Sequence, residues 1–151
     1  MTGGRFLLLG DINIDTVWPV PEFPVPGRDG LVPQVSAEIG GAIVNSAFVF
    51  DHLSQEVSLL GCVGNDIWAE KVRQDLAATN IGQSTIIAKP GSATGLTFII
   101  VTPDGERTMF SHRGANTLLD PLDIHEDLFE GTALLHLSGY ALLESPQKDG
   151  A

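Results

Sequence analysis

Short apolar runs alternate along the chain with segments whose apolar residues recur every three or four positions. Residues 5–10 and 57–64 are nearly continuous apolar runs, as expected for strands buried on both faces. Residues 132–142 predict a further buried strand that runs into a loop. Helical spacing is clearest over residues 66–82, and residues 38–53 predict another helix behind two glycines. This alternation predicts an open, mainly parallel α/β sheet flanked by helices.

Local signals set the expected ends and faces of these helices. Asp66 is the candidate N-cap of one helix, and residues 80–82 are its expected end. Residues 120–129 begin with Asp-Pro and predict a third, capped helix. The helix within 38–53 is expected to carry a periodic stripe consisting of Ala42, Asn45, Ser46, Val49 and Leu53.

A β-hairpin interrupts the alternation. Residues 94–101 are apolar and β-branched, and Pro103-Asp104-Gly105 is a strong turn signal. Residues 107–112 are the expected second strand of the hairpin. Residues 16–35 hold five of the nine prolines, including Pro24, which excludes a helix and favours an extended or edge path. After Ser145-Pro146 the pattern stops in the middle of a strand–helix unit. We therefore expect a fragment of a larger domain, with a small independent domain as the alternative.

Charge and cysteine content narrow the possible partners. Eight Lys and Arg against nineteen Asp and Glu give a net charge of −11, which argues against nucleic acid or an anionic membrane. No apolar run approaches the roughly 18–20 residues of a membrane span, and the first residues read as a strand rather than a signal peptide. The single cysteine, Cys62, lies in an apolar run, which predicts a buried thiol and fits a cytoplasmic protein.

Polar residues follow the first predicted strand, in the sequence GDINID at residues 10–15. Asn13 and Asp15 alternate with apolar neighbours, so an extended chain places both on one face. Ligands of open α/β sheets bind beyond the carboxyl ends of the strands, and an amide beside a carboxylate suits the adjacent hydroxyls of a polyol. The alternative is that both side chains only satisfy backbone groups in a turn.

Glycines and one arginine mark two further places. Gly40 and Gly41 precede the helix that carries Asn45, and they would let the backbone and a helix start approach a ligand; a tight strand-to-helix turn is the alternative. Arg113, in SHRGAN, could recognise a carboxylate or phosphate on a ligand or pair with a carboxylate of the protein. The aromatic residues expected to pack are Trp18, Trp68 and Tyr140, although Trp18 could stack on a sugar.

Motifs of several common sites are missing from the sequence. It has neither GxxxxGK[ST] nor GxGxxG, so neither a phosphate-binding P-loop nor a dinucleotide site is predicted. HExxH, CxxC and GxSxG are also missing, and the four histidines show no close metal-ligand spacing.

Five stretches, in this order, resemble the ribokinase-like, or pfkB-type, carbohydrate kinases: GDINID, PGRDG…EIGGAIVNSA, GCVGNDIWAEKVRQDLAATNIG, ATGLTFIIVTPDGERTMFSHRGAN and ALLHLSGYAL. The resemblance covers essentially the whole chain but only the N-terminal half of a typical member. It implies that residues 1–151 form the N-terminal part of one ribokinase-like α/β domain. Residues 16–37 and 94–112 would form a small β-sheet lid over a sugar.

The resemblance also implies a set of site residues. Asn13 and Asp15 would bind sugar hydroxyls, and Arg113 falls where some relatives contact an acidic or phosphorylated sugar. The full set of implied substrate-binding residues is Asn13, Asp15, Gly40, Gly41, Asn45, Thr97 and Arg113.

Catalysis is expected to need more than these residues. The family's general base is an Asp in a G-A-G-D-like motif of the C-terminal half, and no such motif occurs before Ala151. We therefore expect ATP and Mg²⁺ to act in the full-length enzyme, and this chain alone to be inactive, with no catalytic residue or metal site. Lid strands often pair between subunits in such kinases, so a homodimer through the lid is expected as a possibility.

Two other functions stay open at this point. The chain could be a stand-alone, non-catalytic module that binds a sugar or another metabolite. It could also be a fragment of a nucleoside kinase of the same fold, in which Trp18 or Phe110 would stack on the base.

Overall fold

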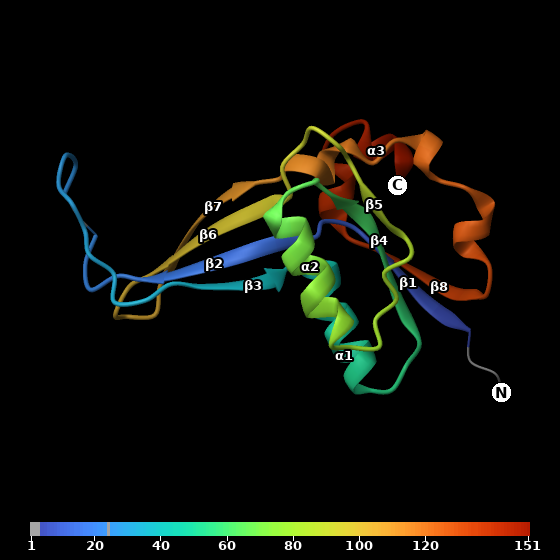
Figure 1. Ribbon diagram of the computed structural model, residues 1–151, viewed down its shortest axis with the longest axis horizontal. Coiled ribbons are helices and arrows are strands. Elements are labelled where there is room, and N and C mark those ends of the chain that lie inside the picture. The colour runs from blue at the N-terminus through green and yellow to red at the C-terminus, as the bar shows by residue number, and fades with distance from the viewer. Residues whose placement is uncertain (1–3, 24) are drawn as a thin grey trace.

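The computed structural model describes residues 4–23 and 25–151, and within them it shows two four-stranded sheets (Figure 1). The first sheet is parallel, in the order β5-β4-β1-β8, and consists of β1 (Arg5–Leu9), β4 (Val57–Val63), β5 (Ile86–Ala88) and β8 (Thr132–Leu137). The second extends to one side as an arm, in the order β3-β2-β6-β7, and consists of β2 (Asn13–Pro19), β3 (Ser36–Gly40), β6 (Gly95–Val101) and β7 (Arg107–His112). The predicted α/β class with a parallel sheet is confirmed.

Both faces of the parallel sheet are covered at β1 and β4, which explains the continuous apolar runs of these central strands. β4 is buried along its whole length. Leu8 and Leu59 are register partners and pack with the helices, whereas Leu9 and Leu60 pack with the 3₁₀ segments η1 (Gly114–Leu118) and η4 (Gly139–Leu142). Full burial of one such leucine side chain contributes roughly 1.5–3 kcal/mol, so this two-sided core anchors the strand ends that carry the polar residues.

Helix α1 (Ala42–His52) forms where predicted, but it buries a different face. Its buried residues are Ile43, Val44 and Ala47, whereas Val49 and Leu53 of the predicted stripe are 59% and 60% exposed. The helix is apolar over most of its length, so spacing alone fits more than one face. Packing against β1 and β4 selects the face that is buried.

Helix α2 (Ile67–Ala77) begins as predicted and ends earlier. The Asp66 carboxylate accepts a hydrogen bond from the Ala69 amide at 2.9 Å, which confirms the N-cap. Ile81 is buried, and Gly82 forms a bridge with Ser58 of β4, so residues 80–82 belong to the return into the sheet.

The arm sheet confirms the predicted hairpin of β6 and β7. β2 pairs with β6 in parallel, and both outer strands are antiparallel to their neighbours. Of the proline-rich stretch at 16–35, only residues 16–19 lie in a strand. The remaining residues of this stretch that the structure describes form neither helix nor strand, and Pro24 lies outside the described residues.

The C-terminal third departs most from the predictions. Residues 120–129 form two 3₁₀ turns, η2 (Pro121–Asp123) and η3 (Glu126–Phe129), instead of one helix. β8 was predicted to be buried, but Leu134 and Leu135 are 45% and 43% exposed, because in the described part of the chain β8 pairs with β1 alone. A short helix, α3 (Gln147–Gly150), follows Pro146.

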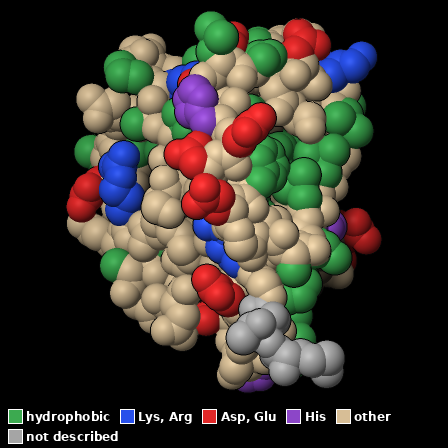
Figure 2. Space-filling model, turned by 90° about the vertical axis from the view of Figure 1, so that its right-hand side faces the viewer, with side chains coloured by type: hydrophobic (Ala, Val, Ile, Leu, Met, Phe, Trp, Pro, Cys, Tyr) green, Lys and Arg blue, Asp and Glu red, His purple; other side chains and the backbone are tan. Residues whose placement is uncertain are grey.

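Figure 2 shows the end of the molecule that carries the termini, with hydrophobic side chains at the surface beside scattered acidic ones. Over residues 4–23 and 25–151, no helix has the length and apolar character needed to cross a membrane.

Candidate functional site

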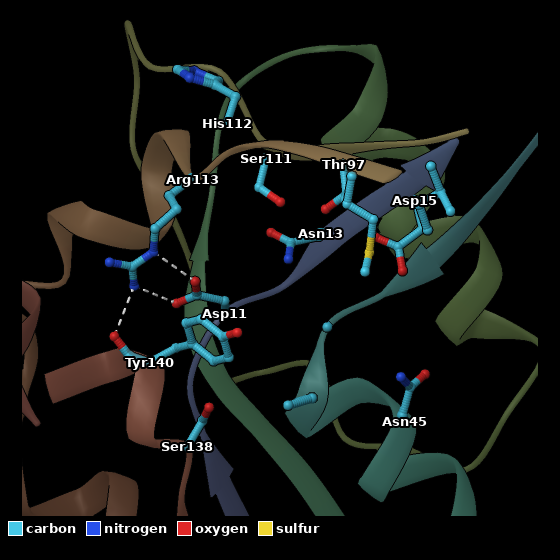
Figure 3. Close-up of a pocket in the computed structure, with 14 residues that line it drawn as sticks. Asp11, Asn13, Asp15, Asn45, Thr97, Ser111, His112, Arg113, Ser138 and Tyr140 are labelled. Carbon is cyan, nitrogen blue, oxygen red and sulfur yellow. Dashed lines mark hydrogen bonds and ion pairs between the residues drawn. The ribbon is translucent and has the colours of Figure 1, made fainter. Parts of the chain in front are cut away.

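A cavity of about 380 Å³ lies where the arm sheet meets the parallel sheet (Figure 3). It forms beyond the carboxyl ends of β1 and β8 and beside the start of α1, which is where open α/β sheets bind ligands. Its lining residues come from five separate segments of the chain and are Asp11, Asn13, Asp15, Gly41, Ala42, Asn45, Thr97, Ile99, Met109, Ser111, His112, Arg113, Ser138 and Tyr140.

The strand register of the arm brings three predicted side chains onto one face. Asn13 and Asp15 lie two positions apart on β2, as their alternation predicted. Asp15 is directly opposite Thr97 of β6, and Thr97 is opposite Ser111 of β7. All four side chains line the cavity together with Ile99 and Met109, so the arm presents both polar and apolar groups to it.

The carboxyl group of Asp15 is partly buried. Burial raises the pKa of its carboxyl group, and the neighbouring Thr97 side chain offsets part of this effect.

Gly40 does not line the cavity, but it lies opposite Asn13 at the end of β3. A Cβ atom at position 40 would lie 2.1 Å from Asp15 Oδ2, so glycine at this position leaves room for the carboxylate.

The start of α1 supplies the opposite wall. Gly41 is the N-cap residue, with φ 106° and ψ 149°, and a Cβ atom there would lie 2.4 Å from the Asp11 carbonyl oxygen. Asn45 follows one turn later and points its amide into the same space (Figure 3). The structure therefore brings the predicted Gly41 and Asn45 together with Asn13 and Asp15.

Arg113 lines the cavity, and its guanidinium is engaged by the protein. It forms two 2.9 Å hydrogen bonds to the two carboxylate oxygens of Asp11 and one of 2.8 Å to Glu144. It also donates to the Tyr140 carbonyl oxygen at 3.1 Å and to the Gln147 side-chain oxygen. The pair with Asp11 raises the pKa of Arg113, and the cluster ties the residues after β8 to the end of β1. In this structure Arg113 therefore pairs with carboxylates of the protein, which is the second of the two alternatives given for it above.

Trp18 and Trp68 pack against other apolar side chains as predicted, whereas Tyr140 does not. Tyr140, expected to pack, is 60% exposed and lines the cavity. Trp18 and Phe110 lie at the alternate positions of β2 and β7, so they occupy the face of the arm opposite Asp15 and Ser111. Trp18 packs against Phe98 with ring centroids 5.8 Å apart. Neither Trp18 nor Phe110 lines the cavity, so neither is placed to stack on a ligand there.

Sequence reasoning also missed two buried polar residues. Asp11 follows Gly10 in the GDINID stretch, and the only signal for it was its place at a strand end. Asn116 is fully buried and donates a 2.8 Å hydrogen bond to Asn13 Oδ1, a contact between residues far apart in the sequence.

The Cys62 thiol is buried as predicted, and burial raises its pKa to about 12.

Metal ligation finds no support among the described residues. Within 4–23 and 25–151, no group of three or more His, Cys, Asp or Glu side chains is placed to hold a metal ion.

Comparison with known proteins identifies the fold first and then the family. The structure superposes on the crystal structure of a ribokinase from Cryptococcus neoformans in complex with ADP, with a TM-score of 0.76, 25% identity, and 91% of this chain and 42% of that chain covered. The chain is therefore a ribokinase-like α/β protein. Residues 5–151 match the pfkB family of carbohydrate kinases, and the chain belongs to that family.

Curated relatives are similar over most of this chain. The ribokinase of Staphylococcus aureus is 26% identical over 121 residues, which are 80% of this chain and 40% of that protein. The 5-dehydro-2-deoxygluconokinase of Geobacillus thermodenitrificans is 32% identical over 114 residues, which are 74% of this chain and 34% of that protein. The chain thus spans about 40% or less of the length of these two relatives.

Proposed function

We propose that this chain is the sugar-binding half of an ATP-dependent carbohydrate kinase that phosphorylates a sugar hydroxyl. One observation carries the proposal: Asn13, Asp15 and Asn45 come from two different elements and line one cavity beside Gly41. A carboxylate only accepts hydrogen bonds, whereas an amide both donates and accepts, and adjacent hydroxyls of a sugar can satisfy both. Membership of the carbohydrate kinase family supports the same ligand class.

The arm would act as the lid in this proposal. Residues 16–37 and 94–112 include most of its four strands, and Thr97 on β6 would contact the bound sugar from above. A lid that closes over a polyol excludes water from the reacting hydroxyl.

Phosphoryl transfer is assigned to the whole protein rather than to these residues. ATP and Mg²⁺ are the expected co-substrate and metal for the family, but the described residues offer no carboxylate or histidine cluster that fits a metal. We therefore assign no reaction step to this chain. Its residues would bind and orient the sugar, and Asp15 would be an orienting group rather than the general base.

Isothermal titration calorimetry with D-ribose, D-fructose and adenosine tests the proposal. Weak, saturable binding of a sugar by the 151-residue chain, with no ADP release from Mg-ATP, is the expected result. Binding of adenosine but neither sugar would favour the nucleoside kinase, for which Tyr140 is the aromatic side chain in the cavity. Tight sugar binding by a monodisperse, cooperatively melting chain would instead favour a stand-alone module. Hydrogen exchange on the same samples should show protection of β6 and β7 when sugar binds.

We propose that the partner is a second copy of this chain, which forms a homodimer through the arm. Phe98 and Phe110 are directly opposite each other on β6 and β7, and they are 40% and 61% exposed on the face away from the cavity. A second copy would cover this apolar face. Sedimentation velocity of Phe110→Glu should show monomers where the wild type shows dimers, while Leu122→Glu, at another position that is 84% exposed, should stay dimeric. A monomeric wild type would contradict the proposal.

A further inference from the structure

We propose that Asn116 is a positioning residue that fixes the side-chain amide of Asn13 with its NH₂ group toward the cavity. The inference rests on the proposed function in one respect, since it assigns a hydrogen-bonding polarity to the sugar site. It concerns a residue that makes no contact with the cavity and lies 103 positions from Asn13 in the chain.

The backbone of Ile12 determines the orientation of Asn116. Asn116 Oδ1 accepts a hydrogen bond from the Ile12 amide at 2.8 Å, and Asn116 Nδ2 donates to the Ile12 carbonyl oxygen at 3.1 Å. A backbone N–H only donates and a carbonyl only accepts, so rotating the Asn116 amide by half a turn would oppose donor to donor and acceptor to acceptor. Because Asn116 is fully buried, solvent water could not satisfy the hydrogen-bonding groups that would then lack a partner.

Asn116 in turn determines the orientation of Asn13. The second proton of Asn116 Nδ2 is donated to Asn13 Oδ1 at 2.8 Å. The Asn13 oxygen is therefore committed to the protein, and its nitrogen faces the open centre of the cavity (Figure 3). Among the residues that the structure describes, Asn13 Nδ2 donates to no protein acceptor.

The absence of a side chain at position 95 makes this contact possible. Gly95 is the register partner of Asn13 between β2 and β6. A Cβ atom at Gly95 would lie 2.1 Å from Asn13 Oδ1 and 2.3 Å from Asn116 Nδ2. The two amides therefore meet in space that any residue other than glycine would fill.

The result is a site with a fixed polarity. Asn13 offers only a donor to the cavity, and the ionised Asp15 offers only acceptors. A ligand must therefore place an oxygen acceptor at Asn13 and a hydroxyl donor at Asp15. A ring or carbonyl oxygen can occupy the first position but not the second, so the pair also orients the sugar.

Side-chain amide exchange measured by NMR on the 151-residue chain tests the proposal. In the wild type, the NH₂ protons of Asn116 should exchange slowly, and those of Asn13 should exchange at least about 10-fold faster. In Asn116→Asp, the carboxylate can no longer donate, so the Asn13 amide should turn its NH₂ group inward. Exchange of the Asn13 NH₂ protons should then slow by about 10-fold, which a merely structural role of Asn116 would not produce. Slow Asn13 exchange in the wild type, or no slowing in the variant, would overturn the proposal.

Thr85→Val is the control for loss of a buried hydrogen bond, and Asn13→Asp keeps the proposal testable if Asn116→Asp unfolds. Thr85→Val removes a buried hydrogen bond to the Leu59 carbonyl oxygen, remote from Asn13, and should leave Asn13 exchange unchanged. Asn13→Asp keeps the acceptor for Asn116 but replaces the cavity donor, so Asn116 should stay protected while D-ribose affinity falls about 10-fold. Loss of Asn116 protection in this variant would count against the proposal. The exchange results stand whether or not D-ribose binds, and failure of the wild type to bind any sugar would contradict the proposed function alone.

Discussion

Asp15→Asn should weaken binding of D-ribose by about 10- to 100-fold, because hydrogen bonds to a charged acceptor are worth about 1.5–3 kcal/mol. The substitution keeps the shape of the side chain beside Gly40, where a Cβ atom would clash with the carboxylate. Calorimetry measures the change. Glu38→Gln is the matched control: Glu38 lies opposite Asp15 on β3 but does not line the cavity, so its replacement should change the affinity little.

The same variant should be more stable than the wild type at neutral pH. Burial raises the pKa of Asp15 in the folded state, so the folded protein holds this proton more tightly than the unfolded chain does. The free energy of unfolding therefore falls as pH rises from the ordinary carboxyl range through the raised pKa. The neutral amide of the variant has no such loss, so the difference in Tm should be positive at neutral pH and shrink in acid. Unchanged sugar affinity in this well-folded variant would refute the role of Asp15.

Gly41→Ala should destabilise the protein by about 3 kcal/mol, a large part of the 5–15 kcal/mol of a typical domain. Gly41 has φ 106° and ψ 149°, a region that other residues rarely adopt, and its added Cβ would lie 2.4 Å from a backbone oxygen. Neither atom can move without shifting α1 against the end of β1. Urea unfolding followed by circular dichroism measures the loss.

Gly105→Ala separates the two causes. Gly105 also has a positive φ, of 85°, but a Cβ atom there meets nothing within 4 Å, because it lies in the turn between β6 and β7. Its replacement should cost about 1 kcal/mol, from backbone strain alone. Equal losses in the two variants would mean that the close approach of Gly41 to the Asp11 carbonyl does not matter.

Local patterns predicted most of the elements correctly. The continuous apolar run of β4, the Asp66 cap of α2 and the turn at residues 103–105 each depend on residues near one another in sequence, so short-range rules suffice. The predictions failed where packing decides. The buried face of α1 was misassigned because the helix is apolar on more than one side. β8 was predicted to be buried because a composition suited to a central strand does not reveal how many neighbours a strand has.

For the candidate site, the amino-acid order alone determined which residues carry usable chemistry: an amide and a carboxylate at alternating positions after a strand, and paired glycines before a helix. Only the tertiary structure decided that these groups share one cavity, that Tyr140 belongs to it, and that Trp18 and Phe110 do not. It also decided that Arg113 pairs with Asp11 and that Asn116 binds Asn13, two contacts between residues about a hundred positions apart. Such contacts depend on where the chain after β7 returns to the end of β1, and no local periodicity encodes that position.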